Sequence, residues 1–275
     1  MRSPVWQISP LTRQDIPLLE AIQPPDWNDI RLVFSRHLGY EYFFAYVIKR
    51  EDGLPVGVGE VIRFGTTAWL GNIIVHPDYQ RQGLGQTLTK YGINHANSLG
   101  ITQIWLLATA QGAPVYRRLG FLDQGRYLFI KTGIPLEQAG SNKLRRIKKQ
   151  DHPQVFNLDQ LASGEDRSQM LSPFLSDGMV TTSTENKSIT GFYLPRLGDG
   201  LTIATNTEDG LALLTRRQSL GKSYLVIPEA NVWLCHYLSH RQYTVFRTAQ
   251  LMVLGAEKKP WRPEMIFNRI GGYAG

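Results

Sequence analysis

The sequence predicts an α/β protein with a mixed α+β sheet, in which one such unit is followed by a second, related unit. Strand-like apolar runs alternate with stretches of helical period through the first half, which is typical of α/β units. One of those runs leads directly into a glycine-bearing loop that opens a helix. A segment near the start, Arg13-Gln14-Asp15-Ile16-Pro17, recurs as Lys149-Gln150-Asp151-His152-Pro153, which indicates a duplicated unit.

Two helices are expected before the first long strand. Residues 12–22 suit the first helix, with Thr12 as its N-cap and Asp15 completing a pattern like a capping box. Residues 27–37 suit the second helix, which a glycine two residues later would end.

The rest of the first half alternates between strands and helices. The turn Glu51-Asp52-Gly53 separates two runs rich in β-branched and aromatic residues, as in a hairpin. Further on, Leu88, Tyr91 and His95 share one helical stripe that Gly100 ends. The expected strands are 42–49, 56–64, 67–75, 101–108 and 126–132, and the expected helices are 85–98 and a short one around Tyr116.

The loop from Gln80 to Gly85 is suited to binding an anion. It follows the apolar strand 73–75 and opens a helix whose first N–H groups, about four of them, have no intrahelical acceptor. Those groups and the positive end of the helix dipole attract phosphate oxygens. Gly83 and Gly85 let a ligand approach the backbone closely, and Arg81 adds a positive charge. The sequence therefore predicts a pyrophosphate site at this loop.

The spacing of the glycines distinguishes between the known kinds of phosphate loop. A dinucleotide-binding loop needs a third glycine where Leu88 stands, and a P-loop needs Gly-Lys-Ser/Thr, which this loop lacks. The remaining pattern is Gln80-x-x-Gly83-x-Gly85, preceded by Val-His-Pro at 75–77. It resembles the acyl-CoA loop of the GNAT superfamily of N-acyltransferases, whose signature is Gln/Arg-x-x-Gly-x-Gly/Ala.

A second motif resembles the same superfamily. Residues 113–121, with the sequence Ala-Pro-Val-Tyr-Arg-Arg-Leu-Gly-Phe, follow the apolar run 104–108. They are similar to the superfamily's short helix that carries a tyrosine and ends in Leu-Gly-Phe, with Gly120 as a left-handed C-cap. The resemblance covers residues 5–135 and implies a GNAT fold with the order ααβββαβαβ.

The resemblance implies direct transfer of an acyl group from acyl-CoA to an amine. It places the pantetheine arm beside the backbone of the strand before the loop, where one N–H would polarise the thioester oxygen. It makes Tyr116 the general acid for the departing thiolate, the alternative being a core aromatic on a short helix. It implies no metal ion. The implied cofactor-binding residues are Ile73, Ile74, Val75, Gln80, Arg81, Gln82, Gly83, Leu84, Gly85, Gln86, Thr87 and Thr109.

Glu60 is the candidate for the general base. Among the acidic residues of 1–137 it alone lies in mid-strand, where a period of two puts it with Val58 and Ile62 on an apolar face. A lone carboxylate on such a face is costly unless it is paired or lines a cleft. Burial should raise its pKa toward a value useful for proton transfer. The alternative is an ion pair with Arg63 or another arginine.

The second half is expected to be a degenerate copy of the first. Residues 205–210, Thr-Asn-Thr-Glu-Asp-Gly, stand in place of the cofactor loop, lack its glycine pattern and carry two carboxylates that would repel a pyrophosphate. The half resembles the C-terminal module of certain bacterial tandem GNAT proteins, whose Gly-x-Asp-Arg segment is matched by residues 164–167, although a plain turn is an equal alternative. The expected domains are an N-acetyltransferase domain, 1–137, and a degenerate GNAT-like α/β domain, 138–275.

Composition predicts a soluble protein of the cytoplasm. Hydrophobic residues make up 42% of the chain and charged residues 19%, as in globular proteins. No run approaches the ~18 apolar residues of a membrane helix, and the chain start has no signal-peptide core. The single cysteine, Cys235, excludes an internal disulfide, which fits a reducing compartment.

The net charge of +7 has two possible explanations. Basic residues are scattered, and the one dense run, 143–149, lies where a linker is expected. A polyanionic cofactor is an adequate reason for a mildly basic surface. Nucleic-acid binding is the rival explanation and would require affinity that falls steeply with salt.

These features together predict an N-acetyltransferase that uses acetyl-CoA as co-substrate and acts without nucleic acid or membrane partners. The acceptor is expected to be a primary amine of a small molecule or peptide, and the protein to be a monomer or homodimer. The alternative is a non-catalytic acyl-CoA sensor or regulatory protein.

Overall fold

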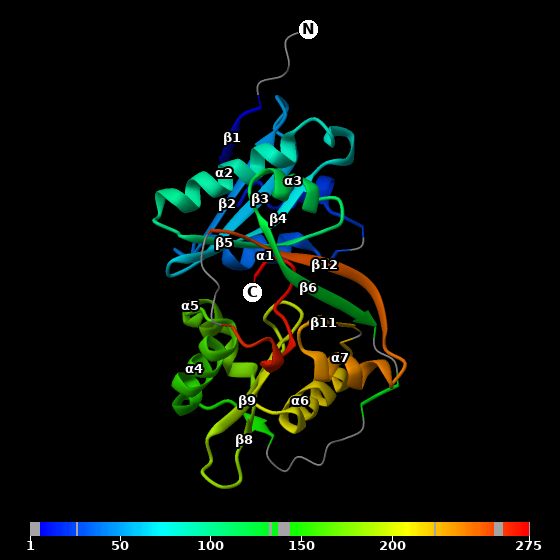
Figure 1. Ribbon diagram of the computed structural model, residues 1–275. Helices are drawn as coiled ribbons and strands as arrows, with labels where there is room; N and C mark the ends of the chain where they lie inside the picture. The colour runs from blue at the N-terminus through cyan, green and yellow to red at the C-terminus, as the bar shows by residue number, and fades with distance from the viewer. Residues whose placement is uncertain are drawn as a thin grey trace. The chain divides into compact units, whose positions relative to one another are not determined.

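The computed structural model describes residues 6–25, 27–131, 134–136, 144–222, 224–255 and 261–274 (Figure 1). These residues form two compact units. The first unit comprises Met1–Leu122, Val253–Ala256 and Gly272–Ala274, and the second comprises Asp123–Met252, Glu257–Gly271 and Gly275. The expected domain boundary between 137 and 138 falls outside the described residues. The first unit also takes in two short segments from the end of the chain.

The first unit is built on a mixed sheet. The hairpin of β2 and β3 and the antiparallel pairing of β3 with β4 confirm the expected strands, and β5 runs parallel to β4. Within this unit the strand order is β1 (Ile8–Pro10), β2 (Phe43–Lys49), β3 (Pro55–Phe64), β4 (Thr67–Val75) and β5 (Gln103–Ala108).

The start of the first unit differs from the expected pair of long helices. Residues 12–16 form turns, in which the Asp15 carboxylate accepts hydrogen bonds from the Thr12 backbone N–H at 2.9 Å and its hydroxyl at 2.8 Å. That closed turn, followed by Pro17, leaves only a 3₁₀ helix, η1 (Pro17–Ile22). Helix α1 (Ile30–His37) begins later than expected, because Asp29 caps it by accepting the Arg31 N–H. The later helices are η2 (Pro77–Tyr79), α2 (Leu84–Ser98) and α3 (Ala113–Arg118).

Helix α2 packs closely on β3 and β4. Leu84 and Leu88 are fully buried on its inner face. Gly92 allows the close approach, because a Cβ there would overlap the Tyr46 hydroxyl and lie 2.9 Å from a methyl group of Leu70. Gly59 plays the same part on β3, beneath the Tyr46 ring. This packing fixes where the first turn of α2 stands relative to the end of β4.

The second unit contains two sets of strands. One set has the order β12 (Thr244–Leu254), β6 (Leu122–Lys131) and β11 (Tyr224–Pro228). The other is a five-stranded sheet with the order β13 (Ile266–Asn268), β10 (Leu201–Ala204), β9 (Ile189–Leu194), β8 (Met179–Thr182) and β7 (Arg145–Arg146). Its helices are η3 (Lys149–Asp151), α4 (His152–Ser163), α5 (Ser168–Leu171), η4 (Ser172–Asp177), α6 (Thr207–Ser219), α7 (Val232–Ser239) and η5 (Pro263–Met265).

The expected repeat is present in the order of elements. From β1 to β6 the chain runs strand, helices, three strands, helix, strand, helix and strand, and the same order recurs from β7 to β12. The copies differ in that η3, α4, α5 and η4 stand where the first copy has η1 and α1, and η2 has no counterpart among the described residues of the second copy. The repeated segment begins at the same place in each copy. Asp15 caps the first turn, and Asp151 accepts the Lys148 N–H at 2.7 Å in the second.

The last strand of each copy does not lie where the sequence suggested. Residues 126–132 were expected to close the sheet of the first half, and this is wrong. Strand β6 lies in the second unit, where β11 is its antiparallel partner from Tyr127 opposite Pro228 to Lys131 opposite Tyr224. The end of β12, Val253 and Leu254, belongs to the first unit instead. The two strands hold equivalent places in the repeat, so each can satisfy the backbone hydrogen bonds of the other's site.

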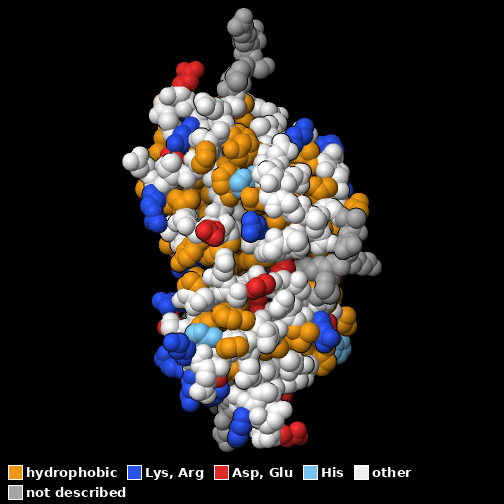
Figure 2. All heavy atoms as spheres, turned by 90° about the vertical axis from the view of Figure 1, so that its left-hand side faces the viewer, with side chains coloured by type: hydrophobic (Ala, Val, Ile, Leu, Met, Phe, Trp, Pro, Cys, Tyr) orange, Lys and Arg blue, Asp and Glu red, His pale blue; other side chains and the backbone are white. Residues whose placement is uncertain are grey.

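The described surface carries charges of both signs. On the face shown in Figure 2, Lys and Arg side chains occur together with acidic, apolar and uncharged ones. Within the described ranges, no helix has the length and apolar character needed to span a bilayer.

Candidate active site

The candidate site begins with a β-bulge in β4. Asn72 and Ile73 stand opposite Gly59 alone, because the register passes from Val58 opposite Ile74 to Glu60 opposite Gly71. Asn72 takes the left-handed conformation that this requires, with φ 46°. A bulge bends its strand and increases the local twist, so β4 changes direction at this point.

Strands β4 and β5 separate beyond the bulge. Their parallel pairing covers only three positions and ends where Trp69 lies opposite Trp105, with the two rings stacked at 6.1 Å. Strand β4 continues to Val75 and β5 to Ala108. Among the described strands, none pairs with residues 71–75 on the β5 side. The backbone of Ile73, Ile74 and Val75 is therefore available on that edge to an extended ligand.

The loop after β4 is anchored to that strand. The Gln80 side-chain amide donates to the Val75 carbonyl at 3.1 Å, which ties the loop to the end of β4. Arg81 has φ 61° and an exposed side chain, and Gly83 has φ 85°. The glycine at 83 therefore has a conformational reason, because a side chain there would be strained.

The start of α2 has the features of an anion site. Gly83 is its N-cap, no side chain caps it, and its first turn holds no acidic residue. Gly85 needs a different explanation from Gly83, since its backbone is helical and a Cβ would meet only Val75 at 3.9 Å. A glycine that neither backbone conformation nor packing requires leaves space for a ligand beside the N–H groups.

The other predicted cofactor residues lie around this point. Leu84 is buried and can offer only its backbone N–H. Thr87 returns its hydroxyl to the Gly83 carbonyl at 3.2 Å. Thr109 follows β5 and is exposed, and its hydroxyl accepts the Gly112 N–H at 3.1 Å, which closes the turn before α3. Gln80, Arg81, Gln82 and Gly83 are exposed, and Gly85 and Gln86 are partly exposed.

Glu60 is fully buried beside the bulge. Its Oε1 accepts a hydrogen bond from the Asn72 amide at 3.0 Å, and no described residue hydrogen-bonds its Oε2. Its hydrogen-bond partner is thus an amide instead of the arginine considered as the alternative. Burial raises the pKa of Glu60 to about 8, against the lowering effect of the Asn72 hydrogen bond. Gly71 makes room for the carboxylate, because a Cβ there would lie 2.6 Å from Oε1.

Tyr116 lies on α3 with its ring partly buried. The ring packs over Gly112, where a Cβ would come within 2.9 Å of it, and meets Phe121 edge-on at 5.9 Å. Burial raises the pKa of Tyr116 to about 12. The hydroxyl is therefore protonated at neutral pH and can act as a hydrogen-bond donor.

Tyr46 is a member of this region that sequence reasoning missed. It is fully buried, no described residue hydrogen-bonds its hydroxyl, and burial raises its pKa well above the ordinary value. Tyr116, Glu60 and Tyr91 all influence its hydroxyl electrostatically. Its pairing opposite Gly59 puts it on the α2 face, whereas Glu60, opposite Ala45, faces the other side. Alternation of faces was readable from the sequence, but the packing of α2 over Tyr46 was not.

Asn72 was also missed, although a signal existed. A Gly-Asn pair within an otherwise apolar strand is a recognised sign of a bulge. The bulge carries the side chain of Asn72 to the Glu60 carboxylate.

The equivalent place in the second unit has lost these features. Asn206 caps α6 by accepting the Asp209 N–H at 2.9 Å, and Glu208 and Asp209 occupy the first turn. Gly210 packs directly against Phe267. Strand β13 pairs with β10 on the edge opposite β9, so that edge has no open backbone to offer.

The raised pKa of Glu60 predicts a pH-dependent cost of folding. The unfolded carboxyl ionises near 4.5 and the folded one near 8, so the native state binds more protons in between and its stability falls as pH rises. The side chain in Glu60→Gln cannot ionise. As the pH rises from 5 to 8, the free energy of unfolding of this variant, measured with urea, should therefore increase relative to that of the wild type by up to about 5 kcal/mol. The exposed control Glu51→Gln should follow the wild type. Parallel stability curves for Glu60→Gln and wild type would contradict the prediction.

Comparison with known sequences identifies the first half. The sequence profile of the Acetyltransferase (GNAT) family matches residues 13–121. The [ribosomal protein bS18]-alanine N-acetyltransferase of Escherichia coli strain K12 is 44% identical over 121 residues, which are 42% of this chain and 79% of that protein.

Comparison with solved structures extends the likeness to both halves. A Pyrococcus horikoshii protein with a provisional acetyltransferase assignment superposes with a TM-score of 0.85 at 19% identity, covering 100% of this chain and 98% of its own. A tandem GNAT protein from the clavulanic acid biosynthesis pathway superposes with a TM-score of 0.63 at 12% identity, covering 92% and 100%. Since the profile and the bacterial relative match the first half, the chain belongs to the acetyltransferase (GNAT) family, and the whole chain shares the fold of a tandem GNAT protein.

Proposed function

We propose that this protein transfers an acetyl group from acetyl-CoA to a primary amine of a small molecule or peptide, in the cytoplasm, as a monomer or homodimer. The observation that carries the proposal is the open backbone of β4 beside an uncapped, glycine-bearing helix start. An extended pantetheine arm and a pyrophosphate need these two features together. In the described chain they occur together in the first unit.

The pantetheine arm would lie along Ile73, Ile74 and Val75 as an additional strand. One of their N–H groups would polarise the thioester carbonyl as negative charge develops on its oxygen. The pyrophosphate would lie at the N–H groups of residues 82–87, with the Arg81 side chain close enough to pair with it. Gln80 would hold the loop in place, and Thr109 would lie at the far side of the separated strands.

Glu60 would serve as general base. A carboxyl whose pKa is near 8 is a stronger base than an ordinary carboxylate and suits proton transfer from an amine near neutral pH. Its Oε2, which no described residue engages, is the oxygen that could accept the proton through a water molecule.

Tyr116 would assist the departure of the CoA thiolate. Its pKa near 12 is above that of a thiol, about 8.5, so complete proton transfer to the thiolate is uphill. A hydrogen bond from the hydroxyl would still stabilise the developing negative charge on sulfur.

The acceptor class is suggested by the bacterial relative, whose name specifies an alanine of a ribosomal protein. An α-amine with a pKa near 8 needs only about 1.4 kcal/mol for deprotonation at pH 7, against roughly 4.6 kcal/mol for a lysine-type amine. Peptides with a free N-terminal α-amine are therefore the first acceptors to test, ahead of lysine and polyamines.

Turnover is the direct test of the proposed activity. Thiol release from acetyl-CoA should depend on the presence of an amine, be fastest with N-terminal peptides, and vanish in Gly83→Glu, which places a carboxylate in the pyrophosphate site. CoA binding with no thiol release for any amine would show the protein to be an acyl-CoA sensor.

Substitution of Gly85 tests whether this glycine is needed for CoA binding and not for folding stability. Gly85→Ala should fold at least as well as the wild type, because its Cβ meets only an ordinary contact and alanine favours the helix by up to about 1 kcal/mol. Its CoA dissociation constant should rise about tenfold or more, or roughly 1.4 kcal/mol. Gly272→Ala, at an exposed glycine where a Cβ would also have space, should leave CoA binding unchanged.

Calorimetry should find one bound CoA per chain. Two equivalent CoA sites per chain would contradict the proposal that the second unit lacks a CoA site.

Tyr116→Phe should separate rate from binding. It should lower kcat by roughly 10²-fold while the CoA dissociation constant stays the same, since the hydrogen bond forms only as the thiolate leaves. The exposed control Tyr40→Phe should retain both values. Equal losses in binding and rate for Tyr116→Phe would instead assign Tyr116 to packing.

A further inference from the structure

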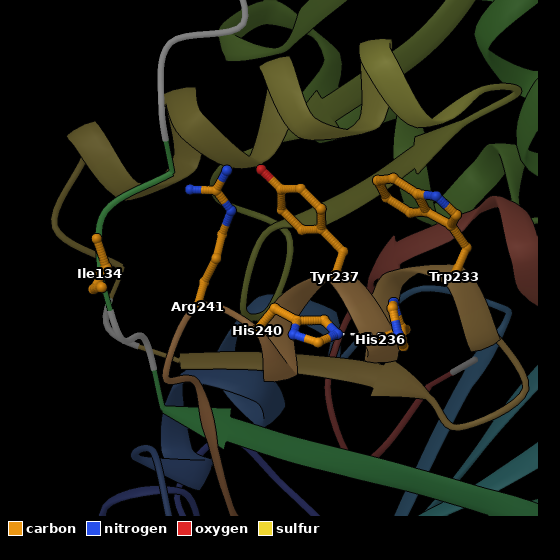
Figure 3. A pocket seen from close by; sticks show the side chains of 6 residues that line it. All are labelled: Ile134, Trp233, His236, Tyr237, His240 and Arg241. Atoms are coloured by element: carbon orange, nitrogen blue, oxygen red, sulfur yellow. Dashed lines mark hydrogen bonds between the residues drawn. The ribbon is translucent and has the colours of Figure 1, made fainter.

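Helix α7, the turn that follows it and Ile134 line an open hollow in the second unit. Its volume is about 470 Å³, and six residues line it: Ile134, Trp233, His236, Tyr237, His240 and Arg241 (Figure 3). Five of the six come from α7 and the turn that follows it. The proposed acetyl transfer uses none of them.

The side chains from α7 and the turn after it line this hollow in two rows. Trp233 stacks on Tyr237 at 5.1 Å with the ring planes 15° apart, and the Arg241 guanidinium lies 4.7 Å above the Tyr237 ring. The second row consists of His236 and His240, both exposed. Figure 3 shows the Arg241 side chain extending toward Tyr237, away from the point where the two imidazoles meet.

The two histidines have the geometry of a chelating pair. Four residues apart on a helix, they lie one turn above the other on the same face. Their Nε2 atoms share a hydrogen bond at 3.0 Å (Figure 3), and the rings are inclined at 70° with centroids 4.4 Å apart. With metal–nitrogen bonds of about 2.1 Å, this separation corresponds to a nitrogen–metal–nitrogen angle of about 90°. That is the angle between adjacent ligands of a tetragonal or octahedral ion, smaller than the tetrahedral angle of a structural zinc site.

We propose that His236 and His240 form a two-histidine site for a divalent transition-metal ion with tetragonal or octahedral preference, such as Cu²⁺ or Ni²⁺. No group of three or more His, Cys, Asp and Glu side chains within the described residues is arranged to hold a metal, so water fills the remaining positions. The hollow has room for several waters of about 30 Å³ each.

The surroundings of the pair are compatible with a cation. The Arg241 charge is held over Tyr237 by the stacking contact. Cys235 does not compete as a ligand, since its sulfur is directed at the carbonyls of Pro228 and Glu229, at 3.9 and 3.6 Å. Imidazole ligands favour Cu²⁺, Ni²⁺ and Zn²⁺ and disfavour Mg²⁺, and the 90° angle selects the first two further.

Calorimetric titration of the full-length, chelator-treated protein tests the site. Cu²⁺ should bind at one ion per chain and more tightly than Ni²⁺, and Mg²⁺ should not bind. His236→Gln and His240→Gln should each raise the Cu²⁺ dissociation constant by at least about tenfold, because each removes one ligand. The electron paramagnetic resonance spectrum of the Cu²⁺-loaded protein should show coupling to two nitrogens, and to one or none in either variant.

His152→Gln provides the matched control, since it removes a histidine of the second unit that lies outside the hollow. It should keep the wild-type dissociation constant. Both site variants should melt at the wild-type temperature without metal, because both side chains are exposed. The proposal is overturned if the wild type shows no saturable site, if neither site variant weakens binding, or if the control weakens it equally.

Discussion

The bulge at Asn72 is the constraint on which the arrangement of the first unit depends. One extra residue in β4 opposite Gly59 turns the strand away from β5 just past the stacked Trp69 and Trp105. Strand pairing is lost there, so backbone groups that a regular sheet would satisfy are left for a ligand. The same bulge brings the Asn72 amide to the buried Glu60 carboxylate. Strand separation and the environment of the candidate base therefore share one cause.

The second unit shows what the same order of elements becomes without that constraint. Strand β10 pairs on both edges, with β9 and with β13, and the following helix is capped by Asn206 and carries acidic residues in its first turn. These changes satisfy the backbone and the helix terminus within the protein itself. The two units therefore share one topology but differ in their backbone hydrogen bonding. In the first unit, the backbone groups of the β4 edge and the α2 N-terminus are left for an extended, anionic ligand. In the second unit, the corresponding groups are paired within the protein.

Buried polar groups in the first unit oppose stability. Glu60 Oε2 and the Tyr46 hydroxyl are buried with no described hydrogen-bond partner, although such groups ordinarily cost free energy of folding. The surrounding contacts hold them in place: Gly71 lies against the Glu60 carboxylate, and Gly59 and Gly92 lie against the Tyr46 side chain. Groups that break the ordinary rules of burial concentrate at functional sites. Their place beside the separated strands is the reason to look for chemistry there.

The sequence by itself determined the features that depend on neighbouring residues. The glycine loop, the start and end of α2, the short α3 with Tyr116, most strands and the degenerate loop before α6 follow from local turn, capping and periodicity rules. Long-range pairing was decided only by the tertiary structure. The positions of β6 and the end of β12, the filling of the β10 edge by β13, and the packing of α2 over Tyr46 each join segments far apart in the chain. Local patterns specify a strand but not its partner, because equivalent strands of a repeat satisfy the same hydrogen bonds.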